Sequence, residues 1–125
     1  MKRIATKIGF ILTLTAVFCF SAAAQNDLKG TKWNWVGTQM RDTRTTVENP
    51  FRYNLDFTTD TNVVMKADCN TANGTYRVAG RNIRFSPFAM TRMACPPGSL
   101  GSQFAQSVQS ARRFRLVGNN SLVLE

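Results

Sequence analysis

The sequence predicts a mainly β (α+β) fold, a small antiparallel, barrel-like twisted sheet with one amphipathic helix. Short segments carry apolar residues at every second position and are separated by polar turns, which is typical of half-buried strands. One segment, between Cys95 and Arg112, instead spaces its apolar residues by three and four, as a helix that covers one opening or edge of the sheet would. This helical stripe consists of Leu100, Phe104, Val108 and Ala111.

The first strands are expected in the amino-terminal half of the mature chain. The stretch "LKGTKWNWVG" places Trp33 and Trp35 on one face of a strand, where we expect core positions, although the pair could also line a ligand pocket. A second strand is expected over residues 51–57, with Phe51 opening its apolar phase. After the polar turn "TTDTN" the alternation continues over residues 63–67.

Two hairpins are expected farther along the chain. Pairing Tyr76 with Phe85 leaves Gly80 and Arg81 as a two-residue loop, and glycine at the first loop position tolerates the positive φ of a type II′ turn. The last hairpin is expected to pair residues 114–116 with residues 122–124 around "GNN". In the first of these hairpins the pairing puts every apolar side chain on one face.

Residues 1–24 have the organisation of a secretory signal peptide, with a basic start, an apolar stretch too short to span a bilayer, and small residues before the cleavage point. Cleavage after Ala24 leaves one domain, 25–125, and loss of three basic residues lowers the net charge from +9 to +6. An uncleaved anchor is the alternative. Lipid attachment at Cys19 is not expected, because Phe18 precedes it instead of a small residue. We therefore expect a periplasmic or secreted bacterial protein with no transmembrane segment in the mature chain.

Cys69 and Cys95 could be a catalytic thiol with a helper, a metal pair or a disulfide. The chain has no histidine, which excludes Cys-His and Ser-His-Asp constellations and the usual imidazole metal sites. Thiols 26 positions apart make a poor zinc pair, and in an exported domain they predict a disulfide. We expect no catalytic residue, no metal and no cofactor, so the protein is not expected to be an enzyme. Catalysis by Ser, Lys or Asp stays open, but no spacing supports it.

The segment 68–95, "DCNTANGTYRVAGRNIRFSPFAMTRMAC", resembles the META-domain family, which includes the HslJ-type heat-shock proteins. The family shows a Cys-Asn, a Gly-x-Tyr-like step and a Thr-x-Met-x-Cys signature, and "GTKW" resembles its first strand. The resemblance extends over nearly the whole mature chain. It implies a compact, barrel-like β fold with one helix in envelope or secreted proteins linked to heat shock, antibiotic tolerance or motility. It implies no catalytic residues, and the motif residues are expected to be structural, as turn formers, hydrogen-bonding groups or core: Trp33, Asn70, Gly74, Tyr76 and Thr91.

The chain departs from the family pattern at two places. Gln103 stands where an acidic residue is common, and the sequence stops at Glu125 where relatives usually continue into another strand. The second departure predicts an open sheet edge that could be a liability or a docking site.

Several arginines fall on the polar phase of their expected strands: Arg52, Arg77, Arg84, Arg113 and Arg115. Arg77 and Arg84 should face each other, which is mildly destabilising for like charges. Their retention indicates a possible anion-binding surface made by Arg77, Arg84, Arg113 and Arg115, although an ordinary solvated basic face is the alternative. Nucleic acid is not expected as a partner, because Tyr76 and Phe85 lie on the core phase and export removes the usual target.

The leading hypothesis is an exported, non-enzymatic META/HslJ-like envelope protein, a binding or stress-tolerance module. Its partner is unknown and could be an anionic envelope component or a protein. One alternative is a periplasmic inhibitor of a lysozyme-type hydrolase, although a charge of +6 would repel basic lysozymes. The other is a lipocalin-like carrier of a small apolar ligand.

Overall fold

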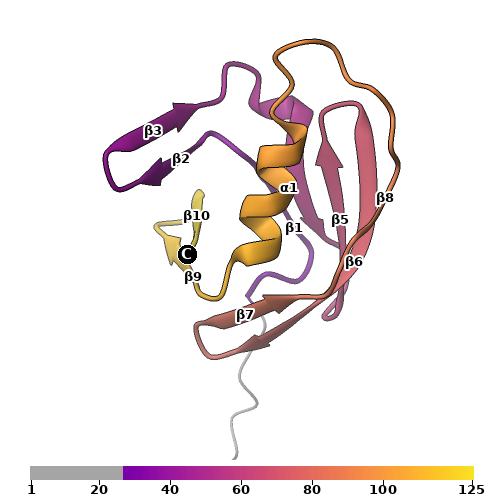
Figure 1. The fold of residues 1–125 in the computed structure, drawn as a ribbon. Helices are drawn as coiled ribbons and strands as arrows, with labels where there is room; N and C mark the ends of the chain where they lie inside the picture. The colour runs from indigo at the N-terminus through magenta and orange to yellow at the C-terminus, as the bar shows by residue number, and fades with distance from the viewer. Residues whose placement is uncertain (1–26) are drawn as a thin grey trace, which may run out of the picture.

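A computed structural model describes residues 27–125, so the expected signal peptide and Cys19 lie outside the described residues. Its main sheet is antiparallel and twisted, and the helix α1 (Gly101–Ser110) lies over one face of it (Figure 1). The strands follow the order β1 (Thr31–Asn34), β4 (Tyr53–Phe57), β5 (Asn62–Ala67), β6 (Asn70–Ala79) and β7 (Asn82–Phe85), with β8 (Ala89–Met90) added to β6. The expected class, mainly β with one helix, is confirmed, but the sheet does not close into a barrel.

Two hairpins accompany this sheet, β2 (Gly37–Met40) with β3 (Thr43–Thr46), and β9 (Phe114–Val117) with β10 (Ser121–Leu124). The β2–β3 hairpin was not expected, and it projects away from the rest of the molecule (Figure 1). The β9–β10 hairpin joins the main sheet through an antiparallel bridge between Asn82 and Arg113. Within the described residues β10 pairs with β9 alone, so β10 has one edge without a neighbouring strand. Its use as a docking site stays a prediction.

The expected hairpin registers are confirmed. Tyr76 pairs with Phe85, and Gly80 has a φ of +59° in the loop that joins β6 to β7. Phe114 pairs with Leu124 in the last hairpin, as the alternation of apolar residues predicts.

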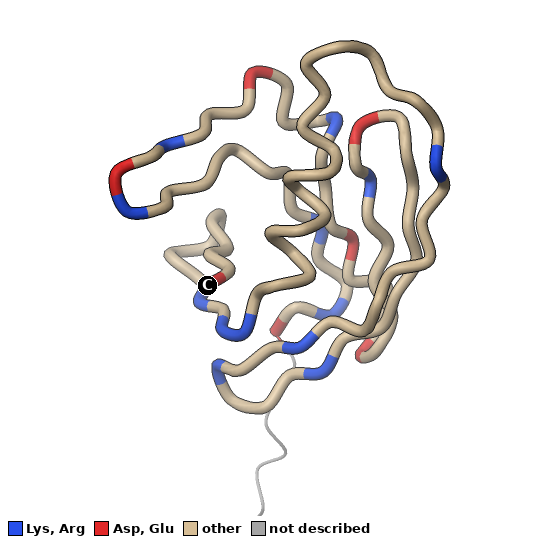
Figure 2. Tube along the Cα trace, viewed as in Figure 1, with Lys and Arg blue, Asp and Glu red and all other residues tan. Residues whose placement is uncertain are grey.

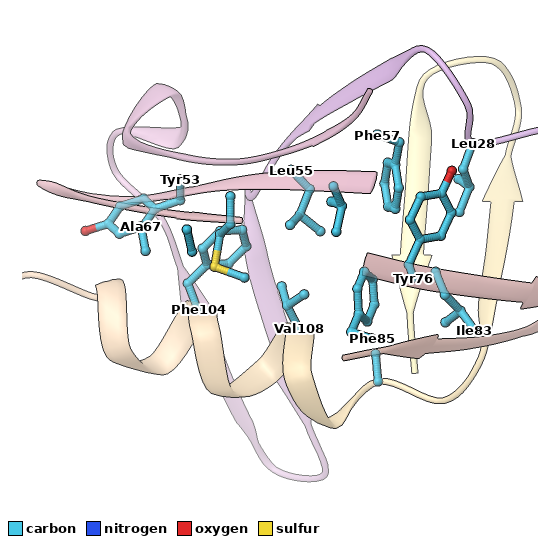
Figure 3. Packing of buried hydrophobic residues seen from close by; sticks show 14 of the residues in the cluster. Leu28, Tyr53, Leu55, Phe57, Ala67, Tyr76, Ile83, Phe85, Phe104 and Val108 are labelled. Carbon is cyan, nitrogen blue, oxygen red and sulfur yellow. The ribbon is translucent and has the colours of Figure 1, made fainter. Parts of the chain in front are cut away.

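The core lies between α1 and the facing side of the main sheet (Figure 3). On the helix, Phe104 and Val108 are buried, and Leu100 and Ala111 pack against the same core from just outside the helix ends, so the expected stripe is confirmed. Trp35 stacks on Phe104 with 5.1 Å between ring centroids, which makes this tryptophan part of the core packing.

The expectation that residues 51–57 form one strand is wrong at its start. Pro50–Arg52 form a short 3-10 helix, in which the Arg52 N–H donates to the Asn49 carbonyl at 3.1 Å, and β4 begins only at Tyr53. Proline lacks an N–H and has a fixed φ, so a turn begins there more readily than a ladder. Phe51, expected in the core, is consequently 75% exposed.

Candidate functional site

The disulfide joins two segments that are far apart in the sequence. Cys69 lies in the two-residue turn between β5 and β6, where Ala67 pairs with Asn70. Cys95 lies in the irregular segment between β8 and α1, of which we call residues 91–98 the strap. The two cysteines are bonded, with 5.5 Å between their Cα atoms. A disulfide at this position is compatible with an extracytoplasmic location.

Asn70 holds the strap beside the disulfide. Its side-chain nitrogen donates to the Met93 carbonyl at 3.1 Å, and its side-chain oxygen accepts from the Met93 N–H at 2.7 Å. The same oxygen accepts from the Thr91 hydroxyl at 2.9 Å, and that hydroxyl accepts from the Thr71 N–H at 3.0 Å. Asn70 and Thr91 therefore act through hydrogen bonds that extend the β6–β8 pairing along the strap.

Gly74 is not the turn residue that its type indicated. It lies in the middle of β6, and a Cβ there would be 2.7 Å from Cδ1 of the Phe88 ring. Glycine is needed at this position because an aromatic ring packs directly on the backbone.

Tyr76 and Trp33 both have their polar groups satisfied. The Tyr76 ring is buried and its hydroxyl donates to the Thr59 carbonyl at 2.7 Å. The Trp33 indole N–H donates to the Thr31 hydroxyl at 2.7 Å, and its ring packs against the core. These contacts give both residues a place in the framework of the fold.

A hollow of about 300 Å³ lies between the strap and the start of α1, bordered by Asn70, Cys95 and Ser102. Glycine, serine and proline form much of the rest of its wall, so it offers little apolar surface of the kind that drug-sized ligands need. Among residues 27–125 there is also no cluster of three or more His, Cys, Asp or Glu side chains that could hold a metal ion.

Residues 26–125 match the family model for the META domain, which covers the motif residues and the strands and helix described above. The chain belongs to the META-domain family. No curated protein and no solved structure matches it. In the part of this META domain that the structure describes, no helix has the length and apolar character needed to cross a membrane.

The candidate binding surface of this META domain is made by arginines on β6, on β7, and on β9 with the bridge residue just before it. Arg77 lies directly opposite Arg84 in the β6–β7 register. Because Tyr76 and Phe85 face the core, both arginines point to the outer side of the sheet, away from α1. Both are exposed. Figure 2 shows basic positions gathered where the β6–β7 hairpin and the start of β9 lie side by side.

The other two predicted arginines come to the same side: Arg113 lies just before β9, and Arg115 lies in β9. Arg113 pairs with Asn82 of β7, which places it on the outer face beside Arg84. Arg115 follows two residues later and thus points the same way, because strand side chains alternate. We call Arg77, Arg84, Arg113 and Arg115 the arginine face.

The four arginines differ in their partners. Nε of Arg115 donates to a Glu125 carboxylate oxygen at 2.9 Å, in a pair whose side chains are about half exposed. In the described part of the chain, none of the ion pairs involves Arg77, Arg84 or Arg113. Three guanidinium groups on one face are therefore left to solvent or to a ligand.

Two other basic residues have structural roles that were missed in the sequence. The Arg112 guanidinium donates to the carbonyls of Gln109 and Ala111, at 3.1 and 2.9 Å, and so caps the end of α1. A basic residue just after a helical stripe is the signal that could have indicated this. Arg52, expected on a solvated face, forms an ion pair with Asp68 instead.

Proposed function

We propose that this META domain is an exported, non-enzymatic binding module of the bacterial envelope, and that its arginine face binds anionic groups of that envelope. The observation that carries the proposal is the opposition of Arg77 and Arg84 on neighbouring strands. Like charges at such positions repel each other, and an anion bound between them would convert repulsion into two charge-assisted hydrogen bonds.

Phosphate is the anion that best suits this surface. Guanidinium groups bind phosphate with two parallel N–H donors, which gives both strength and orientation. Arg113 adds a third guanidinium without a carboxylate partner among residues 27–125. Phosphate groups are abundant in bacterial envelopes, and the Cys69–Cys95 disulfide supports residence outside the cytoplasm.

A non-enzymatic role is supported by the chemistry of the chain. The full sequence has no histidine, so the histidine-based general acid-base and nucleophile-activating arrangements are missing. The arginine face lies on exposed strands, and we propose that it serves binding, with the stress-tolerance role of the family as its physiological setting.

The proposal is tested by binding of the periplasmic protein to vesicles of phosphatidylglycerol and phosphatidylcholine. We expect salt-sensitive binding that falls about tenfold in Arg77→Ser/Arg84→Ser, while the melting temperature does not fall. The matched control is Arg41→Ser/Arg44→Ser in the β2–β3 hairpin, which removes the same charge from another surface. Equal losses in both variants would mean that binding follows net charge alone, and the arginine face would have no special role.

A further inference from the structure

We infer that the preferred ligand of the arginine face is a phosphorylated glycan, which the neighbouring polar residues also contact, whereas bilayer phosphates contact the arginines alone; this inference rests on the proposed function. The reason lies in the residues that continue the same outer face beyond the arginines. Every second residue of β6 before Arg77 points to the same side as Arg77, because strand side chains alternate. These residues are Thr71, Asn73 and Thr75.

The neighbouring strand supplies a matching row. Asn62 of β5 pairs with Thr75, Val64 pairs with Asn73, and Lys66 pairs with Thr71. We call these six residues the polar outer face: Asn62, Val64, Lys66, Thr71, Asn73 and Thr75. Together with Arg77 it extends roughly 20 Å along β6, from Arg77 to Thr71, at the usual rise of a strand.

Asn62, Asn73 and Lys66 of this surface are available to a ligand, whereas the Thr75 hydroxyl donates to the Ser86 hydroxyl at 2.8 Å. The side-chain amides of Asn62 and Asn73 make no hydrogen bond within residues 27–125, and both residues are exposed. In the same part of the chain Lys66 forms no ion pair. An amide both donates and accepts, which suits the hydroxyl groups of a sugar, while the adjacent arginines suit phosphate.

The composition of the polar outer face disfavours a membrane. Its one apolar side chain is Val64, which is 36% exposed, and none of its six residues is aromatic. Proteins that lie on a bilayer combine basic residues with aromatic or large apolar side chains that enter the lipid. The exposed Phe51 belongs to the 3-10 helix before β4 and is not part of these rows. A ligand that carries hydroxyls and phosphates together matches amides, hydroxyls and guanidinium groups on one face.

The test uses the phosphorylated core oligosaccharide released from lipopolysaccharide by complete deacylation, titrated calorimetrically into the periplasmic protein. We expect binding that weakens about tenfold in Asn62→Ala/Asn73→Ala, whereas binding of these variants to the phosphatidylglycerol vesicles is unchanged. Removal of the phosphates from the oligosaccharide should weaken its binding to the native protein. Gln106→Ala is the matched control, because it removes an exposed amide from α1, on the other layer of the molecule.

The outcomes separate this inference from the proposed function. If Asn62→Ala/Asn73→Ala binds the oligosaccharide as the native protein does, the glycan inference is overturned, while vesicle binding lost in Arg77→Ser/Arg84→Ser would still support the arginine face. If the native protein binds neither probe, both the inference and the proposed function are wrong. A selective loss of oligosaccharide binding supports the inference.

Discussion

Arg52 and Asp68 contact each other through both backbone and side chains. The Asp68 N–H donates to the Arg52 carbonyl at 2.8 Å, and the Arg52 guanidinium pairs with the Asp68 carboxylate. The Asp68 side chain is 2% exposed and its φ is +63°, a conformation that aspartate tolerates better than most residues. Since the second carboxylate oxygen has no hydrogen-bond partner, Arg52 is the main compensation for a charge buried beside the disulfide.

Removal of Arg52 should therefore destabilise the fold. We expect Arg52→Ala to lower the free energy of unfolding by about 3 kcal/mol, because it leaves a buried carboxylate without its counter-charge. Urea denaturation measures the change. Arg44→Ala, in the exposed β3 strand, is the control and should change stability by less than about 0.5 kcal/mol. Equal effects of the two substitutions would show that the ion pair contributes nothing specific.

Gly74 and Phe88 should be energetically coupled. The methyl group of Gly74→Ala would lie 2.7 Å from the Phe88 ring, and we expect a loss of roughly 1 to 3 kcal/mol from overpacking. In Phe88→Ala the ring is gone, so adding Gly74→Ala should lower the free energy of unfolding only slightly further. A double-mutant cycle measured by thermal unfolding checks this, and strict additivity would rule out the close packing as the reason for glycine.

Asn70 should contribute more to the stability of the fold than the nearby Asn73, which lies on the same strand. Asn70→Ala removes four hydrogen bonds to the strap, one of them a weak bond to the Cys95 sulfur, and we expect the free energy of unfolding to fall by about 2 kcal/mol. The Met93 amide should then exchange with solvent much faster, because its acceptor is gone. Asn73→Ala serves as control, since that side chain forms no hydrogen bond in the described chain. Unchanged exchange at Met93 would contradict the role of Asn70 in holding the strap.

The disulfide should contribute a large share of the stability of this small domain. On the chain-entropy model, Cys69→Ser/Cys95→Ser should lower the free energy of unfolding by roughly 3 to 4 kcal/mol for a separation of 26 residues. Guanidinium denaturation of the variant and of the oxidised native protein measures the difference. A loss under about 1 kcal/mol would mean that the Asn70 hydrogen bonds hold the strap without the covalent link.

The parts of the fold that the sequence predicted are those with a strong local pattern. The Tyr76–Phe85 hairpin has clean alternation and a glycine in its loop, and its register is confirmed. The β2–β3 hairpin was missed because threonine, glutamine and arginine dominate it and its loop is Arg41-Asp42, without the glycine or asparagine that marks most tight turns. The phase of Phe51 was misread because Pro50 interrupts the strand pattern just before it.

The site residues were harder to predict than the strands. The opposition of Arg77 and Arg84 followed from the hairpin register, but the placement of Arg113 depends on a bridge between segments 31 positions apart, which no local pattern indicates. Gly74 and Asn70 have long-range partners as well, and residue type alone suggested a turn for both. Contacts of this kind are decided by tertiary packing.

The order of the strands affects how the chain can reach this structure. From Tyr53 to Phe85 each strand pairs with the next one in sequence, so little loop-closure entropy is lost when this meander forms. In contrast, β1 must join β4 across the whole β2–β3 hairpin, with Trp33 opposite Leu55. We expect the meander to be the early folding unit and β1 to dock later. In pulse-labelling hydrogen exchange, the amides of β5 and β6 should then be protected before those of β1, and the reverse order would refute this sequence of events.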